Sequence, residues 1–116
     1  MAWLMSEARV LASVDVATTR ASRAKGLLGR DTLEGAFAIP RCRWVHTLGM
    51  RFAIDIAYVG SDDTVIKIAT VRPYRLPGPV PKARTVIEAR AGSFERWGLR
   101  VGDSVEIRTT DPHPVS

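Results

Sequence analysis

Residues 52–71 read FAIDIAYVGSDDTVIKIATV, two apolar runs separated by a short polar segment. The first run, residues 52–59, carries a single charged side chain, Asp55, and the second run spans residues 65–71. Apolar runs of this length that are rich in β-branched residues predict strands. Residues 60–63, GSDD, are typical turn formers, so the whole stretch predicts a β-hairpin.

Further short elements are predicted on both sides of the hairpin. Alternation of apolar and polar residues predicts a strand over residues 9–17, and helical spacing predicts a short helix over residues 18–29. Residues 72–82 contain four prolines, which exclude a helix or a sheet interior and predict a semi-rigid loop. The remaining predicted elements are an apolar run at residues 35–39, strands at 85–89 and 104–108, and one helical turn at 93–97.

The predicted elements define one small domain of the mainly β or α+β class. We expect a barrel-like antiparallel or mixed sheet of about six strands with one or two short helices, because long crossover helices are missing from the pattern. The chain has 116 residues, which is enough for one hydrophobic core. The expected organisation is an N-terminal lead-in at residues 1–8, a globular domain at 9–108 and a flexible tail at 109–116.

Composition limits the location and the class of partner. The formal net charge is +5, which is compatible with nucleic acid, acidic glycans or a membrane surface. The single cysteine, Cys42, cannot form an internal disulfide. No apolar segment has the length of a signal peptide core or of a membrane span, so the sequence predicts a cytoplasmic protein without a membrane span.

The most unusual segment is residues 41–48, which read RCRWVHTL. If this segment is extended, Cys42, Trp44 and His46 share one face. An indole offers a flat apolar platform for a sugar ring, a base or a cation, and an imidazole can donate and accept hydrogen bonds. The alternative is structural, with Trp44 in the core and His46 as a satisfied, partly buried side chain.

Asp55 requires a partner, because a lone carboxylate is costly to bury among apolar side chains. One interpretation is a structural ion pair with Arg23 or Arg30. The other is a couple with His46, in which Asp55 orients a general base. Glu88 is a second carboxylate in an apolar run, so an acid and base pair with Asp55 is a third alternative. The spacing of the histidines, Cys42 and Asp55 matches no recognisable zinc site.

Three blocks of the sequence together resemble a widespread prokaryotic family, the domain of unknown function 192. The blocks are RAKGLLGR at residues 23–30, WVHT at 44–47 with Met50 and IDI at 54–56, and Glu88 with Gly92 and GLRVGD at 98–103. The resemblance covers about residues 9–108 and implies a small, mostly β, barrel-like domain without an established activity. Asparagine is frequent in the family at the position of His46, which favours a hydrogen-bonding or ligand-orienting role there over proton transfer.

The leading functional hypothesis is a non-catalytic binding module without a cofactor or a metal. Its ligand is expected to be small and polar or anionic, such as a glycan. Three alternatives stay open: a hydrolase that uses His46 and Asp55, weak sequence-independent nucleic-acid binding through surface arginines, and an accessory role in a larger assembly. The expected ligand-binding residues are Trp44, His46, Met50, Arg51, Tyr74 and Arg75.

Overall fold

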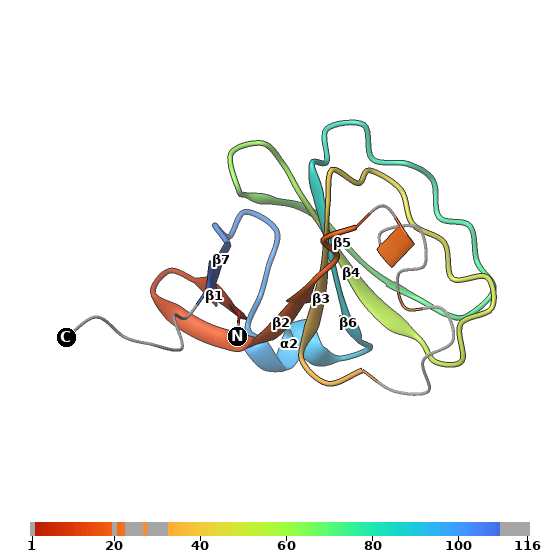
Figure 1. Cartoon of the computed structure of the whole chain (residues 1–116), viewed down its shortest axis with the longest axis horizontal. Coiled ribbons are helices and arrows are strands. Elements are labelled where there is room, and N and C mark those ends of the chain that lie inside the picture. The colour runs from red at the N-terminus through yellow and green to blue at the C-terminus, as the bar shows by residue number, and fades with distance from the viewer. Residues whose placement is uncertain (1, 20, 23–26, 28–32, 110–116) are drawn as a thin grey trace.

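The computed structural model of the chain describes residues 2–19, 21–22, 27 and 33–109. These residues form a seven-stranded mixed sheet and one described helix of a single turn (Figure 1). The domain is therefore mainly β, as the sequence predicts. The elements are β1 (Ala2–Ser6), β2 (Arg9–Val16), β3 (Ala36–Pro40), β4 (Ile54–Val59), β5 (Val65–Val71), β6 (Thr85–Arg90), α2 (Ser93–Trp97) and β7 (Glu106–Thr109).

The strands lie in the order β5-β4-β6-β3-β2-β1-β7. The predicted hairpin is confirmed as β4 and β5, which pair antiparallel, and β4 also pairs with β6. Only β2 and β3 are parallel among these ladders. Gly35 opens β3 with φ +72°, and a Cβ there would lie 2.5 Å from the backbone oxygen of Ser13. Glycine is therefore required where β3 approaches β2.

The sheet curls towards a barrel and does not close. Beyond the two edge strands, an isolated bridge joins Thr64 to Ser104, and the amide of Val105 donates to the carbonyl oxygen of Asp63 at 2.9 Å. The edges β5 and β7 are not joined by a ladder in the described residues. The expected barrel-like shape is therefore an open, strongly curved sheet.

Both faces of the sheet are buried, because alternate residues of β3, β4 and β6 belong to two separate hydrophobic clusters. We call these the Tyr58 face and the Ile87 face. The Ile87 face packs against Phe94 of α2 and against Leu99. The Tyr58 face is covered by the loops between strands, through Val45, Met50 and Ala83 among others. Residues of the Tyr58 face include Phe37, Ile39, Ile54, Ile56, Tyr58 and Val86, and those of the Ile87 face include Ala36, Ala38, Ala57, Val59, Ile87 and Ala89.

Several sequence expectations change at the level of elements. Residues 2–6, expected to be a lead-in, form β1, which pairs with β2 and β7 and buries Leu4 completely. Residues 41–48 are not a strand, because the chain leaves the sheet at Pro40 and Arg41 has φ +55°. Most of the helix expected over residues 18–29, and all of the tail beyond residue 109, lie outside the described residues.

The described part of the chain contains no helix that is long and apolar enough to cross a membrane.

Candidate functional site

The candidate site is built where the ladder between β3 and β6 ends. The last pair of this ladder is Pro40 with Thr85, so the residues that follow Pro40 lie beside those that precede Thr85. The amide of Cys42 donates to the carbonyl oxygen of Arg84 at 3.1 Å, which extends the pairing beyond the sheet. Proline cannot donate to a ladder, and this favours the exit of the chain at residue 40.

Two irregular segments, residues 41–53 and 72–84, continue side by side from this point (Figure 1). We call them the paired loops. The amide of Val80 donates to the carbonyl oxygen of Arg43 at 2.9 Å, and the amide of Tyr74 donates to that of Thr47 at 2.7 Å. Backbone hydrogen bonds therefore fix the loops to each other, although neither belongs to the sheet.

Thr47 provides the central link between the paired loops, and its side chain is fully buried. Its hydroxyl donates to the carbonyl oxygen of Arg72 at 2.6 Å and accepts from the amide of Arg75 at 2.7 Å. The amide of Thr47 in turn donates to the carbonyl oxygen of Arg75 at 2.9 Å. A buried hydroxyl with both its donor and its acceptor used is a strong constraint on the two segments it joins.

Trp44 is an exposed aromatic side chain held in a fixed position. Trp44 is 48% exposed, and its indole Nε1–H donates to the carbonyl oxygen of Pro77 in the opposite loop. The ring of His46 lies 6.2 Å from the indole, centroid to centroid, with an interplanar angle of 55°. The structural alternative, with Trp44 in the core, is therefore wrong, whereas His46 is partly buried as that alternative expects.

A cleft of about 510 Å³ opens beside Trp44. The side chains of its three arginines are all exposed, and acidic residues are not found among the described residues that line it. Exposed guanidinium groups around a concave surface produce a positive potential that attracts anions. The lining residues are Arg41, Cys42, Arg43, Trp44, Ala83 and Arg84.

The structure places the other expected ligand residues at different depths. Met50 is 3% exposed and packs in the core of the Tyr58 face, so its side chain is not available to a ligand. Arg51, Tyr74 and Arg75 are exposed on the paired loops and do not line the cleft. His46 accepts a hydrogen bond at Nδ1 from the amide of Leu48 at 3.2 Å. A neutral imidazole that accepts at Nδ1 carries its proton on Nε2.

Sequence reasoning missed Arg84, which is distant from residues 41–44 in the chain. The positions of Arg41 and Arg84 at the ends of predicted strands could have indicated that the two residues lie together. Arg41 directly follows the apolar run at 35–39 and Pro40, and Arg84 directly precedes the strand at 85–89. Antiparallel pairing of these two strands brings Arg41 and Arg84 together, but nothing in the sequence specifies that β3 pairs with β6.

Asp55 lies on β4 and its carboxylate caps the N-terminus of α2. Oδ2 accepts hydrogen bonds from the amides of Gly92 and Phe94, at 3.0 and 3.1 Å, and Oδ1 accepts one from the hydroxyl of Thr70 at 2.7 Å. A helix N-terminus presents unpaired amides that a carboxylate satisfies well. None of the hydrogen bonds described for Asp55 involves His46, so these bonds give no support to the alternative in which the two side chains form a catalytic couple.

The other interpretation was an ion pair of Asp55 with Arg23 or Arg30, and both arginines lie outside the described residues. It therefore stays a prediction. The cap on α2 was missed because Asp55 and the helix are separated in sequence by more than thirty residues. One feature of the sequence pointed to it. The helical turn at 93–97 begins after Gly92, which has no side chain to accept hydrogen bonds from the first amides of the helix, so these amides need an acceptor from elsewhere.

Glu88 lies on β6 next to Asp55 in the sheet and points to the opposite face. Its strand partner on β4 is Ile56, a Tyr58-face residue, whereas Asp55 is opposite Ala89, an Ile87-face residue. An acid and base pair of Asp55 with Glu88 is therefore wrong. Glu88 is 3% exposed, and Oε1 has no hydrogen-bond partner in the part of the chain that the structure describes. Burial raises the pKa of Glu88 from 4.5 to about 7.

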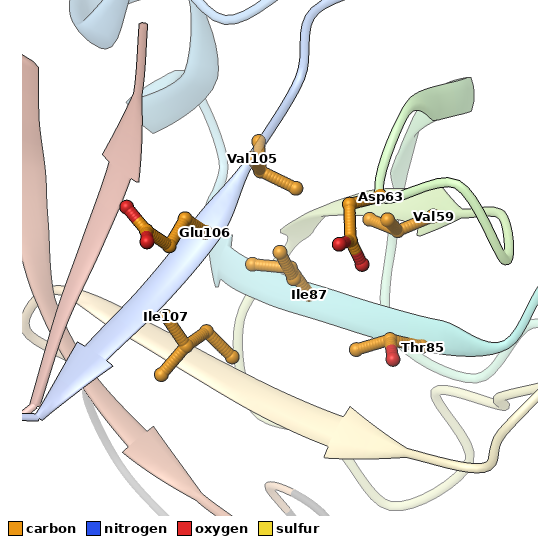
Figure 2. Close-up of a pocket in the computed structure, with 7 residues that line it drawn as sticks. All are labelled: Val59, Asp63, Thr85, Ile87, Val105, Glu106 and Ile107. Carbon is orange, nitrogen blue, oxygen red and sulfur yellow. The ribbon is translucent and has the colours of Figure 1, made fainter. Parts of the chain in front are cut away.

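A second cavity, of about 300 Å³, lies between β7 and residues of β4 and β6 (Figure 2). Figure 2 shows Asp63 turned towards Ile87, whereas the carboxylate of Glu106 is turned away. Glu106 forms an exposed ion pair with Arg108, with 2.8 Å between Oε1 and Nη2. The cavity contains none of the residues expected from sequence, and it results from the incomplete closure of the sheet. Its apolar lining comes from Val59, Ile87, Val105 and Ile107.

Within residues 2–19, 21–22, 27 and 33–109, no group of three or more histidine, cysteine, aspartate or glutamate side chains is placed to hold a metal ion.

Comparisons with known proteins give a family and a fold. The chain is 34% identical over 62 residues to the UPF0127 protein PF1050 of Pyrococcus furiosus and 36% identical over 62 residues to the UPF0127 protein PYRAB11210 of Pyrococcus abyssi. Each match covers 53% of this chain and 53% of the relative, so the chain spans about half the length of these relatives.

Two crystal structures have the same fold. A protein of unknown function from Novosphingobium aromaticivorans has a TM-score of 0.73 and 27% identity, over 90% of this chain and 82% of that chain. A Sinorhizobium meliloti protein, described provisionally as a transcription regulator, has a TM-score of 0.73 and 22% identity, over 90% of each chain. The profile of the DUF192 family, described as Uncharacterized ACR, matches residues 3–107. The chain therefore belongs to the DUF192 family, as its sequence blocks suggested.

Proposed function

We propose that the protein is a non-catalytic binding module for a small anionic ligand with a sugar-like ring, which binds in the cleft beside Trp44. The observation that carries this proposal is the combination of a fixed, half-exposed indole with three exposed arginines around one concave surface. The ligand class follows from the chemistry of these groups.

The indole selects the ring of the ligand. Its hydrogen bond to Pro77 holds the plane in place, so little side-chain entropy is lost when a ligand stacks on it. The C–H face of a sugar packs well against an aromatic plane. His46, beside the indole, offers an Nε2–H donor that suits a ligand hydroxyl.

The arginines select the charge of the ligand. A guanidinium group binds a carboxylate, sulfate or phosphate through two parallel hydrogen bonds. Arg41 and Arg43 come from one of the paired loops and Arg84 from the other, so an anionic group in the cleft can contact more than one cation. Tyr74 and Arg75 are exposed on the adjoining loop, and we propose that they extend the site for a longer ligand.

The same geometry supports binding over hydrolysis. Asp55 is occupied by the amides of α2 and by Thr70, and His46 is oriented by its own loop through Leu48. A general base in a hydrolase needs a partner that orients it and a nucleophile within hydrogen-bonding reach. Among the described hydrogen bonds, none joins His46 to Asp55 and none brings a nucleophilic side chain to His46.

Isothermal titration calorimetry with glucose 6-phosphate, glucuronate and neutral glucose tests the proposal. We expect the two charged sugars to bind more tightly than glucose, and Arg43→Gln to weaken their binding by about tenfold. Trp44→Ala should weaken the binding of all three sugars. Arg100→Gln, which removes an exposed arginine outside the cleft, is the matched control. The proposal fails if the wild type binds none of these sugars, or if Trp44→Ala binds them equally well.

A further inference from the structure

The paired loops carry a charge distribution unlike the rest of the chain. Residues 41–53 and 72–84 contain six arginines and one lysine, and neither segment contains an aspartate or a glutamate. All seven cationic side chains are exposed. The remainder of the sequence therefore contains all twelve acidic residues of the protein. The end of the molecule formed by the paired loops, drawn in yellow and teal in Figure 1, is cationic.

Exposed apolar side chains gather on the same segments. Among the described residues, six large hydrophobic side chains are exposed, and four of them belong to the paired loops. Tyr74 is 64% exposed, Leu76 61%, Trp44 48% and Leu48 41%. The other two, Val10 and Val101, lie outside the paired loops. Grouping of large apolar side chains at one place on a surface indicates an interaction site.

The four side chains come from neighbouring backbone positions. Thr47, which precedes Leu48, is hydrogen-bonded to Tyr74 and Arg75. The indole of Trp44 is hydrogen-bonded to Pro77, which follows Leu76. The four prolines of residues 72–82 and the buried hydroxyl of Thr47 restrict the loops. The surface is therefore ordered before any partner binds, which lowers the entropic cost of association.

We propose that the paired loops dock the protein on the surface of an anionic lipid bilayer. Arginines attract the protein to negatively charged headgroups, with each cation near the surface strengthening binding about fivefold. Tryptophan and tyrosine partition to the headgroup region of a bilayer, and leucine gains free energy by entering its apolar boundary. The inference goes beyond the proposed ligand cleft, because Leu48 and Leu76 do not line that cleft.

The exposed leucines favour a bilayer over a nucleic acid. Bases stack on aromatic or guanidinium planes, and phosphates attract cations, but neither group gives an aliphatic side chain an apolar environment. Leu48 and Leu76 thus contribute to binding on a bilayer and add little on a nucleic acid. A bilayer also accepts exposed side chains of this kind without a complementary groove.

Co-sedimentation with lipid vesicles tests the proposal. We expect the full chain to bind vesicles of phosphatidylcholine with phosphatidylglycerol, to bind phosphatidylcholine alone much more weakly, and to dissociate as salt is raised. Leu76→Ala should lower the partition coefficient about tenfold. Arg72→Gln should lower it about fivefold. Val101→Ala and Arg100→Gln, in the connection between α2 and β7, are the matched controls and should have no effect.

Each of three results would overturn the proposal. One is the absence of binding to the anionic vesicles. Another is equal loss of binding in Leu76→Ala and Val101→Ala, or no loss in either. A single-stranded oligonucleotide measured by fluorescence anisotropy serves as the competing partner, and tighter binding to it, unaffected by Leu76→Ala, also contradicts the bilayer. Calorimetry with glucose 6-phosphate on Leu76→Ala separates the two proposals, because a cleft that binds the sugar normally leaves the proposed function intact.

Discussion

Asp55 stabilises the fold as an acceptor for backbone amides. Asp55 is 3% exposed, and its carboxylate accepts three hydrogen bonds, two of them from amides at the N-terminus of α2. Removal of this group leaves the amides of Gly92 and Phe94 without their acceptor. Burying polar groups without partners is more costly than losing the hydrogen bonds themselves.

We therefore expect Asp55→Ala to lower the free energy of unfolding by about 3 kcal/mol. Asp55→Asn should lower it by a similar amount, because one of the two acceptor oxygens becomes a donor. Urea denaturation followed by circular dichroism measures the effect. Asp15→Ala, on an exposed position of β2, is the control and should change stability by less than about 0.5 kcal/mol. Equal stability of the Asp55 and Asp15 variants would contradict the capping role.

Glu88 makes the stability of the protein depend on pH. Below pH 4.5 the carboxyl is protonated in both the folded and the unfolded chain. Between pH 4.5 and about 7 the unfolded chain releases the proton and the folded chain retains it, so the free energy of unfolding falls as pH rises. Above pH 7 the loss is complete and amounts to about 3 kcal/mol.

Glu88→Gln should remove this dependence, because glutamine does not titrate. We expect the free energy of unfolding of the variant, relative to that of the wild type, to increase by about 3 kcal/mol between pH 4.5 and pH 8. Urea midpoints measured for both proteins across this range test the prediction, since the other titrating groups cancel in the comparison. A difference in stability that does not change between pH 4.5 and 8 would show that Glu88 titrates normally.

At the scale of the elements, Thr47 determines how the paired loops meet. Thr47→Val keeps the shape of the side chain and leaves the amide of Arg75 and the carbonyl oxygen of Arg72 without their side-chain partner. We expect a loss of about 2 kcal/mol in the free energy of unfolding. Hydrogen exchange should also show faster exchange at the Arg75 amide. Thr18→Val, at an exposed position, is the control. Unchanged protection of Arg75 would contradict this role.

The strands were predictable where the signal is local. Residues 52–71 contain two apolar runs and the turn that joins them, and they form the hairpin of β4 and β5. β1 was missed because it is a short segment whose partners, β2 and β7, lie at both ends of the sequence. The alternation of residues 41–48 indicated a strand, but Pro40 ends β3 and the buried hydroxyl of Thr47 fixes a different path.

The candidate site was predictable only in part for the same reason. Trp44 and His46 are two residues apart in the sequence, so their proximity could be inferred, whereas Arg84 reaches the cleft through the register of β3 with β6. Met50 was predicted to bind the ligand. It is buried instead, because the loop turns inward to cover the Tyr58 face. Asp55 was expected to need a partner, and its described partners are a hydroxyl and two amides.

At the scale of the whole molecule, the excess of positive charge is concentrated at one end. The paired loops hold seven cationic residues without an acidic one, and the cleft beside Trp44 opens on the same loops. The protein therefore presents one cationic surface with two features, a cleft sized for a small molecule and exposed apolar side chains. A smaller cavity lies between β7 and the strands β4 and β6 (Figure 2).

The most direct test of the central claim is a ¹H–¹⁵N NMR titration with glucose 6-phosphate. The chain has three tryptophans, Trp3, Trp44 and Trp97, and the Trp44→Phe variant assigns the indole signal of Trp44. We expect saturable shifts of that indole signal and of the amides of residues 41–44 and 83–84, with the signals of Trp3 and Trp97 unchanged. Absence of any saturable shift, or shifts at Trp97 without a shift at Trp44, would contradict the cleft as an anion-binding site.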